Sequence, residues 1–132
     1  MKKNVVKPGD RKKIVKKVQP EDLATFQGTV VHPVYATFSL ARDVEWTTRQ
    51  FIIDMCDDTE EGIGTFLSID HRSPALLDDE VVITAWVDQL NDNELICFFE
   101  VKVDDRLVAI GRTGQKILKK EKIDLIFKKH EQ

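Results

Sequence analysis

The sequence contains few of the residues that support disulfide-rich, fibrous or membrane-spanning structures. Only two of its 132 residues are cysteines, Cys56 and Cys97, and no C-x-x-C motif is present. This pattern excludes a disulfide framework and argues against a metal site of the zinc-knuckle type. The six glycines and four prolines form no linker, and no apolar run approaches the roughly 18 residues of a membrane span. We therefore expect one cytoplasmic domain over residues 1–132, without a metal or a membrane partner.

Basic residues are scarce in the middle of the chain, although the formal net charge is only −3. Residues 18–105 contain 19 Asp and Glu but four Lys and Arg, whereas the two ends together contain 16 basic and four acidic residues. Basic ends can bind the phosphates of a nucleic acid or of coenzyme A, but such runs are more often solvated surface. The acidic middle and the shortage of exposed aromatic residues argue against a nucleic acid partner.

The spacing of apolar residues predicts one long helix followed by several strands. Four apolar residues between positions 39 and 56 recur on one side of a helix, namely Leu40, Val44, Phe51 and Met55. Alternating and β-branched segments predict strands at residues 64–71, 80–88, 94–103 and 106–118, with a Lys-rich edge strand at 11–18. Residues 19–34 are interpreted as an irregular connection with a short helical turn after Pro20, and residues 119–132 as a basic tail. This order predicts an α+β fold in which an antiparallel sheet wraps over the helix.

One carboxylate, Glu45, lies at the margin of the helix's apolar side. On a helical wheel it falls beside Ala41 and Ile52 rather than among the charged residues. We expect this position to be partly desolvated, and a buried charge without a partner is costly enough that such residues usually have a partner or a function. The simpler interpretation is that Glu45 borders the core and reaches water or Arg49.

Thr37 and His71 have comparably simple interpretations. Thr37 stands at the start of the predicted helix, where its hydroxyl can cap a free backbone amide, although Ser39 can do the same. His71 follows a strand and precedes a turn that contains Pro74, a place where functional side chains are often displayed. A single histidine there is more often an ordinary surface residue. Neither residue indicates catalysis by itself.

In combination, the three residues resemble a known family. Thr37 and Glu45 lie within "TFSLARDVEW", His71 ends "GIGTFLSIDH", and a strand "EVVITAWV" follows. This order resembles the hotdog-fold thioesterases of the fluoroacetyl-CoA thioesterase-like family over about residues 34–111. The resemblance implies a hotdog fold, catalytic roles for Thr37, Glu45 and His71, and an oxyanion- or substrate-binding glycine, Gly64, at the opening of the strand. The last strand, "IGRTGQKIL", departs from the family's Gly-Thr-His-Glu-Arg-like stretch, so the resemblance implies no role for it.

The implied activity is hydrolysis of a small or medium acyl-CoA thioester to the free acid and CoA. No cofactor is expected, because CoA is part of the substrate. In one route Thr37 attacks the acyl carbon, His71 acts as the base and Glu45 orients His71. In the other route Glu45 is the base or nucleophile, His71 shuttles a proton and Thr37 positions water or substrate. The amides of Gly64 or of the first helical turn are candidate oxyanion donors. The residues leave the choice between these routes open.

The resemblance also implies an assembly, a homodimer or higher homo-oligomer with acyl-CoA bound in the cleft between protomers. Two other functions fit the same fold, namely a non-catalytic acyl-CoA-binding or sensing domain and a hydratase. A hydratase would use an acid–base couple, for which Asp70 beside His71 is the candidate. Adjacent residues of a regular strand point to opposite faces, which argues against that couple.

Overall fold

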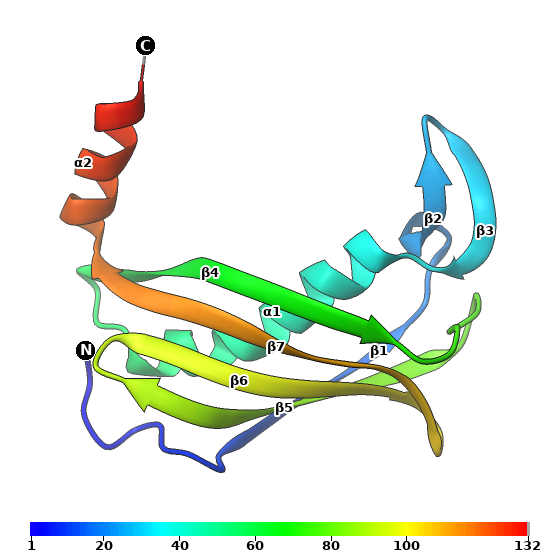
Figure 1. Cartoon of the computed structure of the whole chain (residues 1–132), viewed down its shortest axis with the longest axis horizontal. Coiled ribbons are helices and arrows are strands. Elements are labelled where there is room, and N and C mark those ends of the chain that lie inside the picture. Colours follow the sequence, from blue (N-terminus) through cyan, green and yellow to red (C-terminus); the bar gives the residue numbers. More distant parts are fainter. Residues whose placement is uncertain (132) are drawn as a thin grey trace.

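A computed structural model describes residues 1–131, and its main feature is a five-stranded antiparallel sheet in the order β1-β5-β6-β7-β4 (Figure 1). The strands of this sheet are β1 (Arg11–Lys17), β4 (Glu60–His71), β5 (Glu80–Asn91), β6 (Glu94–Val103) and β7 (Arg106–Lys119). One long helix, α1 (Thr37–Met55), lies along one face of the sheet. The predicted α+β architecture, with the sheet wrapped over a single long helix, is confirmed.

The core lies between α1 and this face of the sheet. The four apolar residues that predicted the helix are all buried there: Leu40, Val44, Phe51 and Met55. Strand β6 contributes alternate residues, as its sequence pattern predicts, namely Leu95, Cys97, Phe99 and Val101. The buried residues recur about every 3.6 positions in the helix and every two positions in the strand, because only one side of each element faces the core.

Tight turns connect β5 to β6 and β6 to β7. Asp92 and Asp104 take left-handed backbone conformations there, with φ of 57° and 51°. Aspartate tolerates this region better than most residues because its short polar side chain bonds locally. The turn at Asp104 and Asp105 joins the two predicted strands 94–103 and 106–118 into a hairpin and places the last strand next to β6.

The short helical turn predicted after Pro20 is confirmed, but the rest of the irregular connection predicted at residues 19–34 is wrong. A 3₁₀ turn, η1 (Pro20–Asp22), leads into a hairpin of β2 (Leu23–Phe26) and β3 (Thr29–Tyr35). The hairpin turns at Gly28, where φ is +80°. Its pairing contains two register shifts and β3 is mostly exposed, so no alternation of apolar and polar residues marks it in the sequence.

Within the predicted basic tail, residues Lys120–His130 form a helix, α2, that the sequence pattern did not predict. Its apolar residues Ile123, Ile126 and Phe127 follow the helical spacing of three and four residues, but they are few among many lysines. Among the boundaries that differ, α1 begins at residue 37 instead of 39, β4 begins at Glu60 instead of residue 64, and β5 ends at Asn91 instead of residue 88. Gly64 is therefore inside a strand and does not open it.

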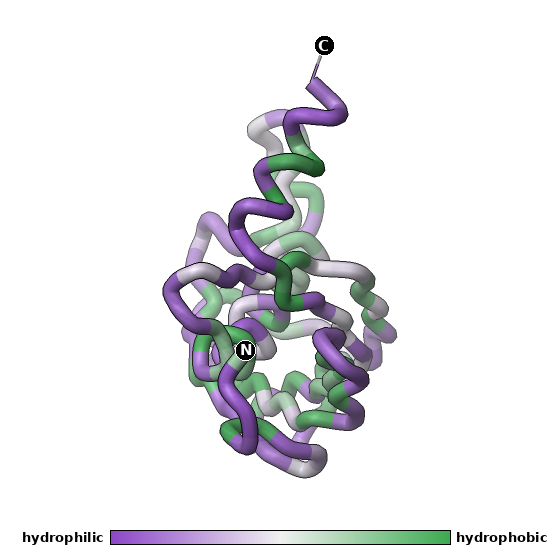
Figure 2. The backbone as a smooth tube through the Cα atoms, turned by 90° about the vertical axis from the view of Figure 1, so that its left-hand side faces the viewer, coloured by the Kyte–Doolittle hydropathy of each residue, from purple (hydrophilic) through white to green (hydrophobic). Residues whose placement is uncertain are grey.

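Helix α2 and the β2–β3 hairpin stand at opposite ends of the molecule, and both extend beyond the edge formed by β4 (Figure 1). The view from the side, in Figure 2, also shows α2 extending above the body, with hydrophobic residues alternating with the hydrophilic ones along its backbone. Strand β4 is the last strand of the sheet, and none of the strands formed by residues 1–131 pairs with its outer edge. Within residues 1–131, no helix is long and apolar enough to cross a membrane.

Candidate active site

Thr37 and His71 meet where α1 begins and β4 ends. Thr37 Oγ1 lies 3.0 Å from His71 Nε2, at hydrogen-bonding distance, and both residues are exposed. The residue that caps α1 is Ala36, which has no side chain for the purpose. The interpretation of Thr37 as a helix cap is therefore wrong, and its hydroxyl is available to His71. A hydroxyl hydrogen-bonded to an imidazole nitrogen is the arrangement of an activated nucleophile and its general base.

A buried network holds the start of α1, and sequence reasoning missed it. Asp22 is fully buried, and its backbone carbonyl accepts a hydrogen bond of 2.8 Å from the amide of Ala36. Its carboxylate accepts hydrogen bonds from Arg42 Nη2 at 2.9 Å and from the amide of Gln19 at 2.9 Å. Lys16 Nζ lies 3.3 Å from the same carboxylate. The network fixes the residue immediately before Thr37, and only contacts between residues of β1, η1 and α1 reveal it.

Charges and burial shift the titration of this network. Burial raises the pKa of Asp22, but the hydrogen bonds from Arg42 and Gln19 and the charge of Lys16 outweigh it, so the pKa lies below its ordinary value. Tyr35 donates a hydrogen bond to Asp43, and its pKa is raised by burial and by this carboxylate. At neutral pH Asp22 is therefore ionised and Tyr35 is neutral.

A pocket of about 510 Å³ surrounds the Thr37–His71 pair. Most of its lining is apolar and comes from the β2–β3 hairpin, the start of α1, the segment after β4 and β7, including Phe26, Val34, Phe38, Ala75 and Val108. Phe26 and Phe38 pack edge to face, with ring centroids 6.2 Å apart. The pocket has the size and polarity of a site for a small apolar group next to a reactive hydroxyl.

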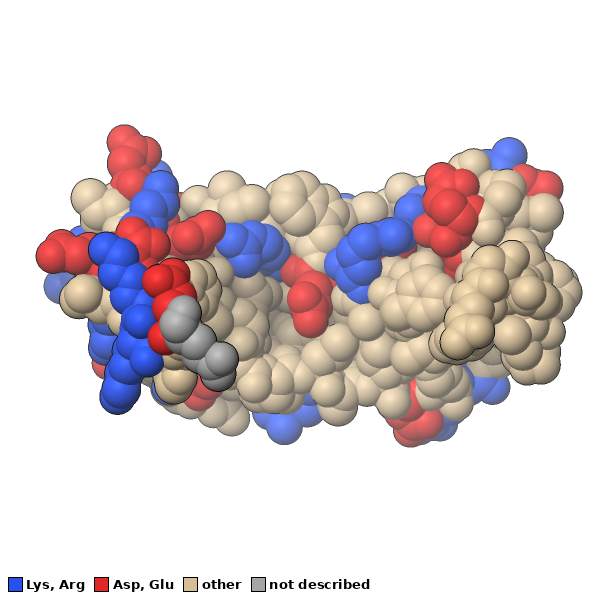
Figure 3. Space-filling view, turned by 90° about the horizontal axis from the view of Figure 1, so that it is seen from above, with Lys and Arg blue, Asp and Glu red and all other residues tan. Residues whose placement is uncertain are grey.

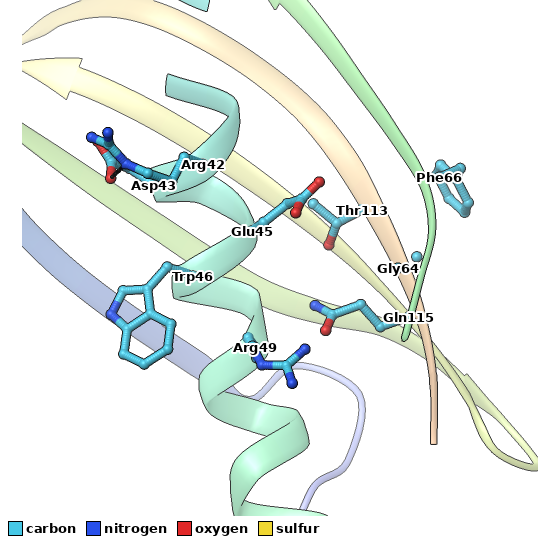
Figure 4. A pocket seen from close by; sticks show the side chains of 10 residues that line it. Arg42, Asp43, Glu45, Trp46, Arg49, Gly64, Phe66, Thr113 and Gln115 are labelled. Carbon is cyan, nitrogen blue, oxygen red and sulfur yellow. Dashed lines mark hydrogen bonds and ion pairs between the residues drawn. The ribbon is translucent and has the colours of Figure 1, made fainter. Parts of the chain in front are cut away.

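Glu45 lines a different hollow, of about 570 Å³, between α1, β4 and β7. Figure 4 shows its side chain directed from the helix towards Thr113 on β7. Glu45 is exposed, so the expected partial desolvation is wrong: α1 and β4 separate here and leave the hollow open. Arg49 does not pair with Glu45, because it donates to the carbonyl of Gly62 at 3.2 Å and lies 3.9 Å from Glu61.

Gly64 lines this second hollow together with Glu45, and so do three residues of β7, Thr113, Gly114 and Gln115. Gln115 Nε2 donates a buried hydrogen bond of 2.9 Å to Thr48 Oγ1, which ties the floor of the hollow to α1. The last strand, for which the resemblance implied no role, therefore contributes to the site region.

Within one protomer the structure brings Thr37 to His71 but does not bring Glu45 to either. Eight residues of helix separate Thr37 from Glu45, which corresponds to about 12 Å along the axis. The two hollows have no lining residue in common. A triad of Thr37, Glu45 and His71 is therefore not assembled in a single copy of the chain.

Two other chemistries find less support in the geometry. Asp70, the partner that a hydratase would need, binds Arg72 at 2.9 Å, while His71 binds Thr37. The two side chains are thus engaged separately. For metals, residues 1–131 contain no group of three or more His, Cys, Asp and Glu side chains that could hold an ion.

The comparison with protein families matches residues 18–121 to the fluoroacetyl-CoA-specific thioesterase family. The match covers most of the chain and includes Thr37, Glu45, Gly64 and His71. The chain belongs to this family. This membership makes the protein a thioester hydrolase that acts on acyl-CoA, and it confirms the resemblance that these four residues carried. No curated protein sequence matches the chain.

Several solved structures have the same fold as this chain. A hypothetical protein of Thermus thermophilus, described as a thioesterase superfamily member, is 29% identical, with a TM-score of 0.89 over 96% of this chain and 93% of that one. A hot-dog-like protein from Thermanaerovibrio acidaminovorans gives 16% identity and a TM-score of 0.88, covering 97% and 96%. The fluoroacetyl-CoA thioesterase itself gives 15% and 0.87, covering 96% and 98%. The fold of this family member is the hotdog fold.

Proposed function

We propose that this thioesterase hydrolyses small or medium acyl-CoA thioesters with Thr37 as nucleophile and His71 as general base. The observation that carries this proposal is the 3.0 Å contact between Thr37 Oγ1 and His71 Nε2 at the mouth of an apolar pocket. The alternative route, in which Glu45 attacks, has weaker support because Glu45 lies in a separate hollow within the protomer. The reaction needs no cofactor beyond the CoA of the substrate.

The proposed reaction has two stages. His71 Nε2 takes the proton of the Thr37 hydroxyl as its oxygen attacks the thioester carbon, and the carbon–sulfur bond then breaks. His71 returns the proton to the departing CoA thiolate, which leaves an ester between the acyl group and Thr37. Water, deprotonated by His71, attacks this ester and releases the free acid, and Thr37 regains its proton.

The start of α1 supplies the electrostatic part of this proposal. Thr37 is the first residue of the helix, and the first-turn amides of a helix have no carbonyl partner within it. These amides carry the positive end of the helix dipole next to the carbon that Thr37 attacks. They are therefore the proposed donors to the oxyanion, in preference to the amide of Gly64, which lies in the other hollow.

Glu45 enters the proposed site from a second copy of the chain. Strand β4 has a free outer edge, and two copies that pair antiparallel through it would extend the sheet and hide its unpaired amides. Antiparallel pairing places the end of β4, with His71, beside the first half of the other copy's β4, which contains Gly64. Gly64 and Glu45 line one hollow. The proposed homodimer therefore presents Glu45 of one protomer to Thr37 and His71 of the other, where it orients His71 or the attacking water.

Thiol release from a panel of acyl-CoAs tests the catalytic assignment. Acetyl-, fluoroacetyl-, hexanoyl- and benzoyl-CoA sample the apolar pocket. We expect Thr37→Ala and His71→Ala to lower kcat by about 10²–10⁴-fold, the range of a lost nucleophile or base. Mass spectrometry of a quenched reaction should show an acyl group on Thr37. Full turnover by Thr37→Ala would refute the nucleophile, and acyl transfer to Glu45 would support the other route.

Mixing two inactive variants tests the assembly of the site. If Glu45 acts in trans, heterodimers of Glu45→Ala and His71→Ala contain one complete site, and unfolding and refolding the mixture restores up to about a quarter of wild-type activity. The matched control mixes Thr37→Ala with His71→Ala, which share one site and restore nothing. No recovery in the first mixture would place Glu45 in the same protomer as His71.

We also place this thioesterase in the cytoplasm, because both cysteines are free thiols.

A further inference from the structure

The C-terminal helix α2 has an apolar side that its own protomer does not cover. Ile123 is buried at the base of the helix, but Ile126 and Phe127, on the same side, are exposed. The helix contacts the body mainly through β7. Most of its remaining surface is charged and contains Lys120, Lys122, Lys128 and Lys129. An apolar helix side that extends beyond the part packed on its own protomer is typical of a helix that docks on a second surface.

The β2–β3 hairpin at the opposite end of the molecule has the complementary composition. Residues 23–35 contain no Asp, Glu, Lys or Arg, and Phe26, Val30 and Val31 are exposed. Figure 3, which views the β4 edge from above, shows the hairpin as an uncharged mass at the right-hand end with charged side chains beside it, whereas the α2 end carries many basic side chains mixed with acidic ones. Phe38, at the start of α1, extends this uncharged patch and is also exposed.

Pairing through β4 would bring these two surfaces together. A twofold axis through the middle of β4 and perpendicular to the sheet exchanges the two ends of the molecule. Because α2 and the hairpin both extend past the same edge from opposite ends (Figure 1), the rotation places α2 of each copy beside the hairpin of the other. The hairpin also supplies Phe26 and Val34 to the pocket that contains Thr37 and His71.

We propose that α2 docks on the β2–β3 hairpin of a second copy and forms the outer wall of that copy's Thr37–His71 pocket. This inference rests on the proposed homodimer and deepens it, because each acyl site then includes a helix from the other protomer. Phe127, which is 59% exposed, meets the hairpin near Phe26. A helix in this place limits the length of acyl chain that the pocket accepts.

Helix α2 offers a matched pair of variants for the test. Leu125 is 62% exposed, as apolar as Phe127, and two residues away, which places it on the opposite side of the helix. Sedimentation equilibrium should show that Phe127→Asp raises the dimer dissociation constant at least tenfold, whereas Leu125→Asp changes it less than twofold. Phe26→Asp, on the docking surface, should act like Phe127→Asp. Equal effects of Phe127→Asp and Leu125→Asp, or a monomeric wild type, would overturn the inference.

A kinetic measurement tests the pocket wall separately from catalysis. At protein concentrations well above the dissociation constant, Phe127→Asp should change the ratio of kcat/KM for hexanoyl-CoA to that for acetyl-CoA at least threefold. Leu125→Asp should leave the ratio unchanged. An unchanged ratio in Phe127→Asp, with an active and dimeric wild type, would overturn this inference alone. A wild type that releases no thiol would instead overturn the proposed function, and the dissociation constants would still decide whether α2 docks.

Discussion

Replacing Asp22 tests whether the network before α1 holds the protein together and positions Thr37. In Asp22→Ala the amide of Gln19 and the Arg42 and Lys16 groups lose their shared acceptor. A hydrogen bond to a charged group contributes about 1.5–3 kcal/mol, whereas the part-buried amide of Gln19 can exchange its lost acceptor for water. Arg42 is half exposed and can turn to water, which reduces its share. We expect a loss of about 2–4 kcal/mol in the free energy of unfolding, measured by urea denaturation at pH 7.

The control for this prediction is Asp22→Asn, which keeps an acceptor oxygen but removes the charge, and should cost about 1–2 kcal/mol. The pH dependence has a definite sign. The pKa of Asp22 is lower in the folded protein than its ordinary value of about 3.9, so its stabilisation is complete above that value and disappears as pH falls through the folded pKa. The wild type and Asp22→Asn should therefore converge in acid. A loss below about 0.5 kcal/mol in Asp22→Ala, or a difference that grows in acid, would refute the reasoning.

Three further predictions concern the sheet and the hollow that contains Glu45. A Cβ added at Gly114 would clash with the ring of Phe66, so Gly114→Ala should lower the free energy of unfolding by about 1–3 kcal/mol in chemical denaturation. Gln115→Leu removes the buried bond to Thr48 and should cost about 1 kcal/mol, and a double-mutant cycle with Thr48→Val should show that the two losses are not additive. Burial raises the pKa of the Cys97 thiol to about 12, so at pH 8 this thiol should not react with a thiol reagent in the native protein; rapid labelling would contradict its burial.

The candidate site shows why sequence patterns locate residues better than they locate contacts. Thr37, Glu45 and His71 were found by their order along the chain, and the structure joins the first to the third. It leaves Glu45 in a separate hollow, because a helix spreads residues eight positions apart along its axis. Asp22 and Gln115 escaped notice because a buried polar residue has no periodic signal; its partners come from distant elements.

The sequence by itself determined the long helix, the strands β5 to β7 and the identity of the catalytic candidates, since these depend on local periodicity and on residue type. Only the tertiary structure decided that Thr37 contacts His71, that the β2–β3 hairpin and α2 exist, and that β4 leaves an open edge between them. The physical reason is that the hairpin and α2 bury little within the protomer. A segment with few buried residues carries few apolar positions, too few for the clear one-sided pattern that burial in a core imposes on a sequence.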